Sequence, residues 1–258
     1  MKVFKENIWR KRNGLCWLSA VITAIVLGSS ICGTTSAVPV YYFGADPGAG
    51  SSNPRPNSNA AAAAFDAAAA SGLGPINIIN FEAVPPGNFT SLTVAPGVTA
   101  TQINNDMSLG GIVTEGFATP HGAPTGYNVT EGGRYFLGFV PKGDIGTATL
   151  MFKFETPIWA WGAYIVGLEE SINGDLFIEF NDGVARSFEL VDNTVAGIEF
   201  FGFTDLGTSI TEISLVLRKV SGTRDIYGID EVRYVAIPEP ATLLLLGLGR
   251  LGLLKRRR

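Results

Sequence analysis

The sequence predicts an all-β protein with a single β-sandwich, and three observations support this prediction. First, apolar side chains recur with a period of two across much of residues 76–236, which places them on one face of each strand. Second, the runs are short and are bounded by Gly, Asn and Asp, the residues of turns. Third, we count nine or ten such runs in about 160 residues, enough for one sandwich with a full core.

The clearest strand lies at residues 147–156, TATLMFKFET. Leu150, Phe152 and Phe154 fall on one face, and charged residues fall on the other. Residues 211–220, TEISLVLRKV, alternate in the same way. Shorter runs of this kind are DLFIEF, ARSFEL, GIEFFGF and YGIDEVRYV. The turn Asn181-Asp182-Gly183 predicts a hairpin between the first two of these, since glycine readily takes a positive φ.

Residues 38–75 precede the sandwich and predict a flexible linker followed by an Ala-rich helix. Residues 44–59 are rich in Gly, Pro, Ser and Asn, which indicates a flexible lead-in. Residues 60–70 are almost all alanine, the best helix former, with Ser58 or Asn59 as the cap and Gly72 at the end. A single short helix is marginal alone, so we expect it to pack through Phe65. Low-complexity disorder is the alternative.

Residues 1–37 have the three parts of a secretory signal peptide. A basic beginning is followed by an apolar segment at about 15–31 and by small residues that end at Ala37. This order predicts export across the cytoplasmic membrane and a cut by signal peptidase after Ala37. An uncleaved membrane anchor is the alternative.

The other end of the chain also carries a membrane-directed segment. An apolar run at 241–254, interrupted by Arg250, follows a Pro-Glu-Pro turn. As a helix its 14 residues span about 21 Å, which is short against a hydrocarbon core of about 30 Å. The basic end that follows is held on the cytoplasmic side. Residues 237–258 therefore predict a short transmembrane helix with a basic end, in the inner membrane.

This tripartite tail resembles the PEP-CTERM sorting signal. The residues that carry the resemblance are Pro238, Glu239, Pro240, Lys255, Arg256, Arg257 and Arg258. The resemblance implies an exosortase, a membrane-embedded cysteine transpeptidase of bacteria that make extracellular polysaccharide. It also implies that the tail is a transient anchor, cut near the Pro-Glu-Pro turn, after which the protein reaches the cell surface or the biofilm matrix. Arg250 departs from the usual charge-free run.

Composition excludes several classes of function. Both cysteines, Cys16 and Cys32, lie in the signal peptide, so the mature chain has no disulfide or thiol chemistry. Residues 38–240 hold 9 Lys and Arg against 22 Asp and Glu, a net charge of −13, which argues against binding nucleic acid. With His121 as the only histidine, histidine triads and zinc sites are nearly excluded.

Several strings resemble the extracellular domain that often precedes this tail. They are INFEAVPPG, TPIWAWGAYIVG, FFGFTD and DIYGIDEVRYV, and they are similar to jelly-roll sandwiches related to carbohydrate-binding modules. In those modules two carboxylates often hold a structural Ca²⁺. The matching positions here are Glu82 and Asp230, with Asp225 as a less favoured third ligand. The alternative is that Glu82 and Asp230 accept backbone hydrogen bonds at strand ends.

Aromatic residues are the usual contacts of sugar-binding proteins. The alternation in IWAWGAY places Trp159 and Trp161 on one face, opposite Tyr164, and core packing is the favoured interpretation. Tyr127 and residues 135–136 lie in a loop-rich stretch and indicate a rim.

We therefore expect a non-catalytic, secreted surface or matrix protein that associates with extracellular polysaccharide in a structural or adhesive role. A specific carbohydrate-binding module is the alternative. A glycoside hydrolase is a distant third, because an acidic chain always offers some pair of carboxylates, such as those at 169–179.

Overall fold

The computed structural model describes residues 39–238 except for short gaps, and these belong to a compact unit of residues 37–258. The gaps are residues 52, 73, 104–109, 115–125, 130–132, 141–146, 169–175, 181–184, 189–196, 206, 208 and 219–224. The predicted signal peptide and the apolar tail lie outside the described residues. Among the described residues, no helix is long and apolar enough to cross a bilayer.

The described chain forms strands and a single helix, in agreement with the predicted all-β sandwich. In chain order the elements are β1 (Val40–Pro47), α2 (Pro56–Ala70), β2 (Asn77–Ile79), β3 (Gly87–Asn88), β4 (Ser91–Ala95), β5 (Val98–Ile103), β6 (Gly111–Thr114), β7 (Arg134–Val140), β8 (Thr147–Val166), β9 (Leu176–Phe180), β10 (Ala185–Phe188), β11 (Gly197–Thr204), β12 (Ile210–Arg218) and β13 (Asp225–Ala236). The jelly-roll connectivity stays an expectation.

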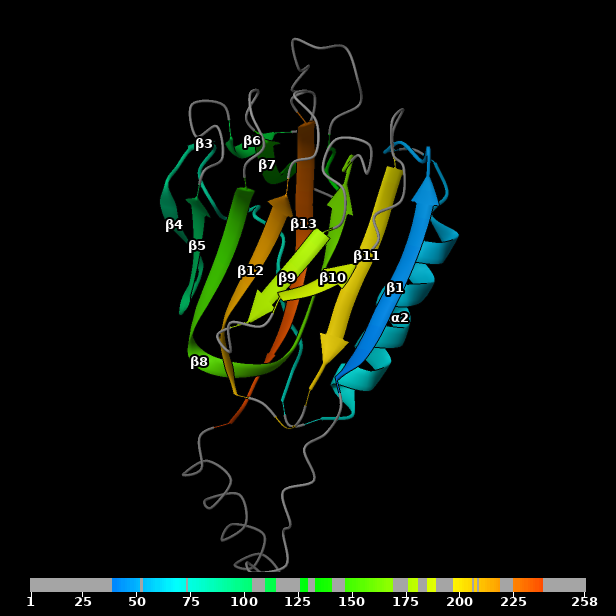
Figure 1. The fold of residues 1–258 in the computed structure, drawn as a ribbon, viewed down its shortest axis with the longest axis vertical. Helices are drawn as coiled ribbons and strands as arrows, with labels where there is room; N and C mark the ends of the chain where they lie inside the picture. The colour runs from blue at the N-terminus through cyan, green and yellow to red at the C-terminus, as the bar shows by residue number, and fades with distance from the viewer. Residues whose placement is uncertain are drawn as a thin grey trace, which may run out of the picture. The chain divides into compact units, whose positions relative to one another are not determined.

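The long strand β8 joins the two layers of the sandwich. Its first half pairs with β5 and β12, and its second half pairs with β11 and β13. Phe152 and Trp161 belong to different halves, yet their ring centroids are 6.1 Å apart. Nine residues of straight strand would separate them by about 30 Å, so β8 must bend back on itself. Figure 1 shows this bend at the lower end of the domain.

Each half of β8 lies within its own sheet. The first sheet has the order β4-β5-β8-β12-β9-β10, and the second has the order β1-β11-β8-β13-β7-β6-β3, with β2 beside the end of β13. The apolar core between the sheets contains the predicted inward residues Leu150, Phe152 and Phe154. Aromatic contacts cross it, for example Phe180 to Phe203 at 4.4 Å between centroids. The period-two pattern is thus confirmed as the core face of these strands.

Helix α2 covers the outer face of the second sheet. Phe65 is fully buried there, with its ring 5.7 Å from that of Phe200 and 5.8 Å from that of Tyr42. Gly202 makes room for these rings, since a Cβ at this position would lie 2.9 Å from the Phe65 ring. The predicted packing of the helix through Phe65 is confirmed. The alternative, disorder of this segment, is not supported, because residues 56–70 form helix α2.

The flexible linker predicted before the helix is wrong for residues 40–47. These residues form β1, which pairs with β11 over its whole length. The helix also starts earlier than predicted, at Pro56, where proline is favoured in the first turn. Its cap is neither Ser58 nor Asn59. The carboxylate of Asp46 accepts the backbone N–H groups of Asn57 at 3.1 Å and Ser58 at 2.8 Å.

The predicted hairpin agrees with the observed strand pairing. β9 and β10 pair antiparallel, as the hairpin prediction requires, although the turn between them lies outside the described residues.

The predicted common face of Trp159 and Trp161 is wrong. Val235 and Ala236 pair with Ala160 and Ile158, so β8 has an extra residue at Trp159. This bulge turns Trp159 toward the helix, whereas Trp161 stays between the sheets.

Candidate functional site

Glu82, the first predicted calcium ligand, is engaged by hydrogen-bond donors. Its Oε1 accepts the backbone N–H of Arg134 at 2.8 Å and the side-chain amide of Asn128 at 3.2 Å. The guanidinium of Arg134 in turn donates to the carbonyl oxygens of Glu82 at 2.7 Å and Val84 at 3.0 Å. These bonds fasten the segment after β2 to the start of β7.

Asp230, the second predicted ligand, is fully buried in β13. Its Oδ2 accepts the backbone N–H of Val129 at 2.8 Å, and its Oδ1 accepts that of Glu231 at 2.7 Å. Glu231 has a positive φ of 46°, and a bulge lies here between Asp230 and Arg233. The carboxylate therefore holds a strained backbone turn in place.

The two predicted ligands thus meet one short segment, because Asn128 contacts Glu82 and Val129 contacts Asp230. Both carboxylates accept hydrogen bonds from backbone N–H groups, as the alternative interpretation expects, and Glu82 accepts one more from the side-chain amide of Asn128. Asp225 is also buried, and its Oδ1 accepts the N–H of Ile226 at 2.7 Å. The described residues gather no group of three or more His, Cys, Asp or Glu side chains. These donor sets fit a hydrogen-bonding role better than a cation site, and a structural Ca²⁺ stays a prediction.

The aromatic residues predicted as a rim are buried instead. Tyr127, Tyr135 and Phe136 are at most 7% exposed. Burial raises the pKa of Tyr127 to about 12, and its hydroxyl donates to the carbonyl of Ala49 at 2.8 Å. The tryptophans Trp159 and Trp161 are buried too, which confirms the core interpretation for both. None of these rings is exposed enough to stack on a sugar.

The exposed aromatic side chains lie on β1, a strand that the linker prediction had missed. Among the described residues, three of the five exposed large apolar side chains are Val40, Tyr41 and Phe43, at 53%, 42% and 48% exposure. Tyr41 and Phe43 lie opposite Phe203 and Phe201 of β11, so they share the face that the core of the sandwich uses. At β11 that face is covered by the first sheet, but at β1 it is open. We call Tyr41 and Phe43 the aromatic ledge.

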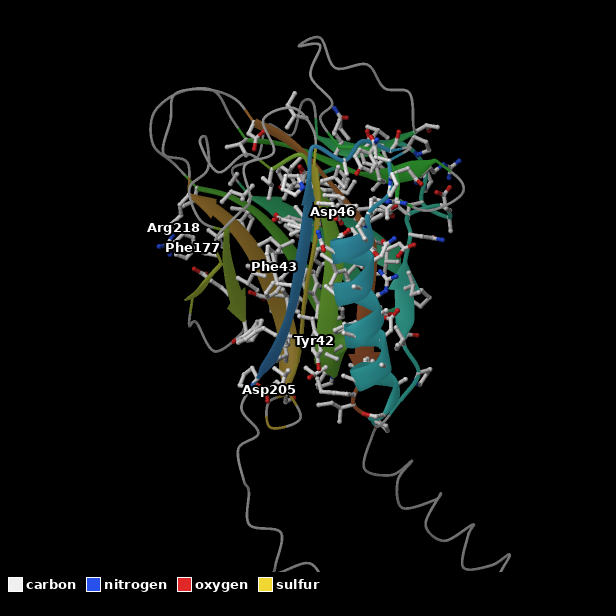
Figure 2. All side chains as sticks on the ribbon, turned by 90° about the vertical axis from the view of Figure 1, so that its right-hand side faces the viewer. Tyr42, Phe43, Asp46, Phe177, Asp205 and Arg218 are labelled. Carbon is white, nitrogen blue, oxygen red and sulfur yellow. The ribbon has the colours of Figure 1, made fainter. Side chains whose placement is uncertain are left out.

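The ledge is held by rigid surroundings. β1 pairs with β11 along eight residues, and the intervening Tyr42 packs edge-on against Phe65 of the helix. Figure 2 shows Phe43 on the side of β1 away from α2. Strand geometry places the Cα atoms of Tyr41 and Phe43 about 7 Å apart, with both side chains on one face. A pair of rings at this spacing offers a flat, apolar contact surface.

Another partly exposed aromatic residue, Phe177, lies on the outer face of the first sheet. The guanidinium of Arg218 stands 3.8 Å from the ring centroid of Phe177 and 3.8 Å from the carboxylate of Glu179. Figure 2 shows Phe177 and Arg218 together, on the first-sheet side of β1. Because Arg218 covers this ring, the ring offers less free area than the ledge does.

A pocket of about 180 Å³ lies beside the end of β13. Phe154 and Tyr234 line it with ring centroids 5.2 Å apart. The other lining residues are Asn77, Pro96, Gly97, Val98, Thr156 and Ala236. Burial raises the pKa of Tyr234 above its ordinary value. The pocket has no carboxylate among its lining residues.

The remaining predicted residues fall mostly outside the described part of the chain. This is true of His121, of the acids at 169–175 and of the sorting residues from Glu239 onward. Pro238 is the last described residue and is half-buried.

Comparison with known proteins identifies the end of the chain. Residues 236–258 match the PEP-CTERM protein-sorting motif, which confirms the predicted sorting signal and indicates export with membrane-anchored sorting. No curated protein matches this chain.

Several solved structures resemble the chain at low identity. The K2 cleaved adhesin domain of Lys-gingipain (Kgp) has 15% identity and a TM-score of 0.39, with 63% of this chain and 98% of that chain covered. A mutant form of the family 29 carbohydrate-binding module CBM29-2 has 10% identity and a TM-score of 0.34, with 64% and 99% covered. The family 11 carbohydrate-binding module of the cellulase Lic26A-Cel5E of Clostridium thermocellum has 8% identity and a TM-score of 0.34, with 64% and 97% covered. These TM-scores lie below 0.5, and the likenesses fix neither a ligand nor a role for this chain.

Proposed function

We propose that this protein is an exported, exosortase-sorted component of the cell surface or extracellular matrix, and that it associates with extracellular polysaccharide without catalysis. The observation that carries the proposal is the sorting motif at residues 236–258. The predicted signal peptide at the other end supports the same route. Signal peptidase and an exosortase are then its processing partners, and the tail anchors it in the inner membrane until it is cut.

The lack of catalysis is proposed from composition. After removal of residues 1–37 the chain has one histidine and no cysteine. A Cys–His pair therefore cannot form, and a Ser–His pair would depend on His121 alone. The described carboxylates Glu82, Asp205 and Asp230 accept backbone hydrogen bonds. Carboxylates held by such bonds stabilise turns and favour a structural role over acid–base work.

The aromatic ledge is the surface that we propose for contact with polysaccharide. Pyranose rings present apolar C–H faces, and Tyr41 and Phe43 present two exposed rings at a fixed spacing on a strand. Because pairing with β11 and packing of Tyr42 already order β1, little conformational entropy is lost on binding. The acidic charge of residues 38–240 favours neutral or cation-bridged polysaccharide over strongly anionic chains.

The proposal is tested with full-length protein in mild detergent, mixed with the polysaccharide of the producing bacterium and sedimented. We expect the double variant Tyr41→Ala/Phe43→Ala to bind at least about tenfold more weakly, since a central aromatic contact contributes about 1–2 kcal/mol. The matched control is Ile78→Ala/Ile103→Ala, which truncates two side chains of similar exposure elsewhere, at 53% and 42%. Equal binding by both double variants would reject the ledge, and no binding by the wild type would reject polysaccharide association.

A specific carbohydrate-binding module is the second candidate, and the fixed spacing of the two ledge rings favours it. A glycan array separates the two functions. Saturable binding to one sugar, lost in the ledge variant, identifies a specific module. Weak binding to many glycans identifies a general matrix protein.

A further inference from the structure

Both ends of the described chain leave the domain at the same end of the second sheet. Val40 of β1 lies opposite Thr204, Thr204 lies opposite Ala160, and Ala160 lies opposite Val235 of β13. These residues form one row across four neighbouring strands. At about 4.8 Å between strands, Val40 and Val235 are about 14 Å apart. Figure 1 shows the start of β1 and the end of β13 at the lower end of the domain, which we call the base.

The sorting motif begins without a spacer. It starts at residue 236, which is the last residue of β13. The next residue, Ile237, is still part of the fold, because its N–H donates to the carbonyl of Pro157 at 2.7 Å and its side chain packs against the core beneath the helix. Only three residues, 238–240, then separate Ile237 from the apolar run that starts at Ala241. In a fully extended chain the four steps from Ile237 to Ala241 span about 14 Å.

The described residues of the base are 39–41, 71–72, 74–77, 95–98, 155–157, 204–205, 207, 209 and 235–238. No lysine or arginine occurs among these described residues, and their charged side chains are the exposed Glu155 and the buried Asp205. The described part of the base therefore has no cationic group with which to attract anionic lipid headgroups. It does expose Val40 and Tyr41, and the pocket lined by Tyr234 opens beside it. Contact with a bilayer of no net charge would therefore depend on the tether and on apolar surface, and would be insensitive to salt.

We propose that the anchored protein rests with its base directly against the lipid bilayer, with the start of β1 and the end of β13 side by side at the headgroups. This inference rests on the proposed membrane sorting by the tail. A precursor that still carries the predicted signal peptide and the tail is compatible with the same orientation, because both ends of the described chain leave the domain at the base. The two processing cuts, after residue 37 and near residues 238–240, then fall at one surface of the domain.

Helix α2 provides two matched positions for a test. Ser51 precedes the helix at the far end of β1, and Ser71 follows it at the base; both are exposed. The 15 residues of the helix span about 22 Å. The full-length protein would carry Cys16→Ser and Cys32→Ser, together with either Ser51→Cys or Ser71→Cys, and each variant would be labelled with a fluorophore. Circular dichroism checks that both variants fold alike.

The labelled proteins are reconstituted into phosphatidylcholine vesicles that contain a headgroup-attached contact quencher, and flotation is measured first. We expect the protein to float with the vesicles, the label at position 71 to lose most of its emission and the label at position 51 to lose almost none, at both about 0.05 and about 0.5 M salt. Flotation with equal quenching at the two positions, or with stronger quenching at position 51, would overturn the orientation. Failure to float would instead overturn the membrane sorting on which the orientation rests.

Discussion

Replacing Phe65 by alanine tests whether helix α2 belongs to the folded domain. Phe65 is fully buried between the helix and the second sheet, with Tyr42 and Phe200 around it. Loss of a buried phenylalanine costs about 3–5 kcal/mol of unfolding free energy. For a domain of this size the expected fall in Tm is about 6–20 °C. The variant raises the intrinsic helix propensity at this position, so any destabilisation comes from lost packing.

The measurement is thermal unfolding of the full-length protein in mild detergent, followed by circular dichroism. Phe43→Ala is the matched control, because it removes the same side chain from a position that is 48% exposed, and we expect its effect to stay within about 0.5 kcal/mol. A flexible or disordered segment before the sandwich predicts equal, small effects of the two variants. Equal Tm values would therefore refute the packing of α2 described above.

Three further predictions concern other parts of the domain. Asp46→Ala should lower stability by about 1–2 kcal/mol at pH 7 through loss of the helix cap. Burial raises the pKa of Asp46, but hydrogen bonds from the start of the helix outweigh this effect and keep the pKa below its ordinary 3.8. The stability of the wild type should therefore fall as the pH drops below about 3.8, because the carboxylate becomes protonated. The variant lacks this carboxylate, so this part of the pH dependence should be absent from it. Gly202→Ala should cost about 1–3 kcal/mol, since the added Cβ would lie 2.9 Å from Phe65, and denaturant titration would show it. If Glu82 and Asp230 hold Ca²⁺, excess Ca²⁺ after EDTA treatment should raise Tm, whereas an unchanged Tm in both conditions would leave only their hydrogen bonds.

The core strands could be predicted because their chemistry is local. Leu150, Phe152 and Phe154 recur at every second position, with charged residues at 153 and 155 between and after them, and this pattern fixes the buried face. The strand β1 was missed for the opposite reason. Its sequence VYYFGADP alternates no polar residues and runs into a Gly- and Pro-rich stretch, so nothing local reveals that β11 pairs with it. The Asp46 cap was missed because it comes from a different element.

The candidate site was harder to predict than the fold. The bulge at Trp159 reverses the side-chain alternation of β8 without any glycine or proline at that position. The aromatic ledge depends on which strands end up at the sheet edge, and that is set by pairings between residues more than 150 positions apart. The signal that could have found it is the cluster of three aromatic residues at 41–43, just after the predicted signal peptide. The sorting motif, in contrast, is a linear pattern and was recognisable from the sequence alone.

The mass of the mature protein tests the central claim, that this chain is exported and sorted by its tail. The protein is recovered from the surface and matrix of a producer that has an exosortase, and its intact mass is measured. The account predicts a chain that begins near residue 38 and ends near Pro238-Glu239-Pro240, without the basic end at 255–258. A chain that still carries Lys255–Arg258 in that material would contradict it.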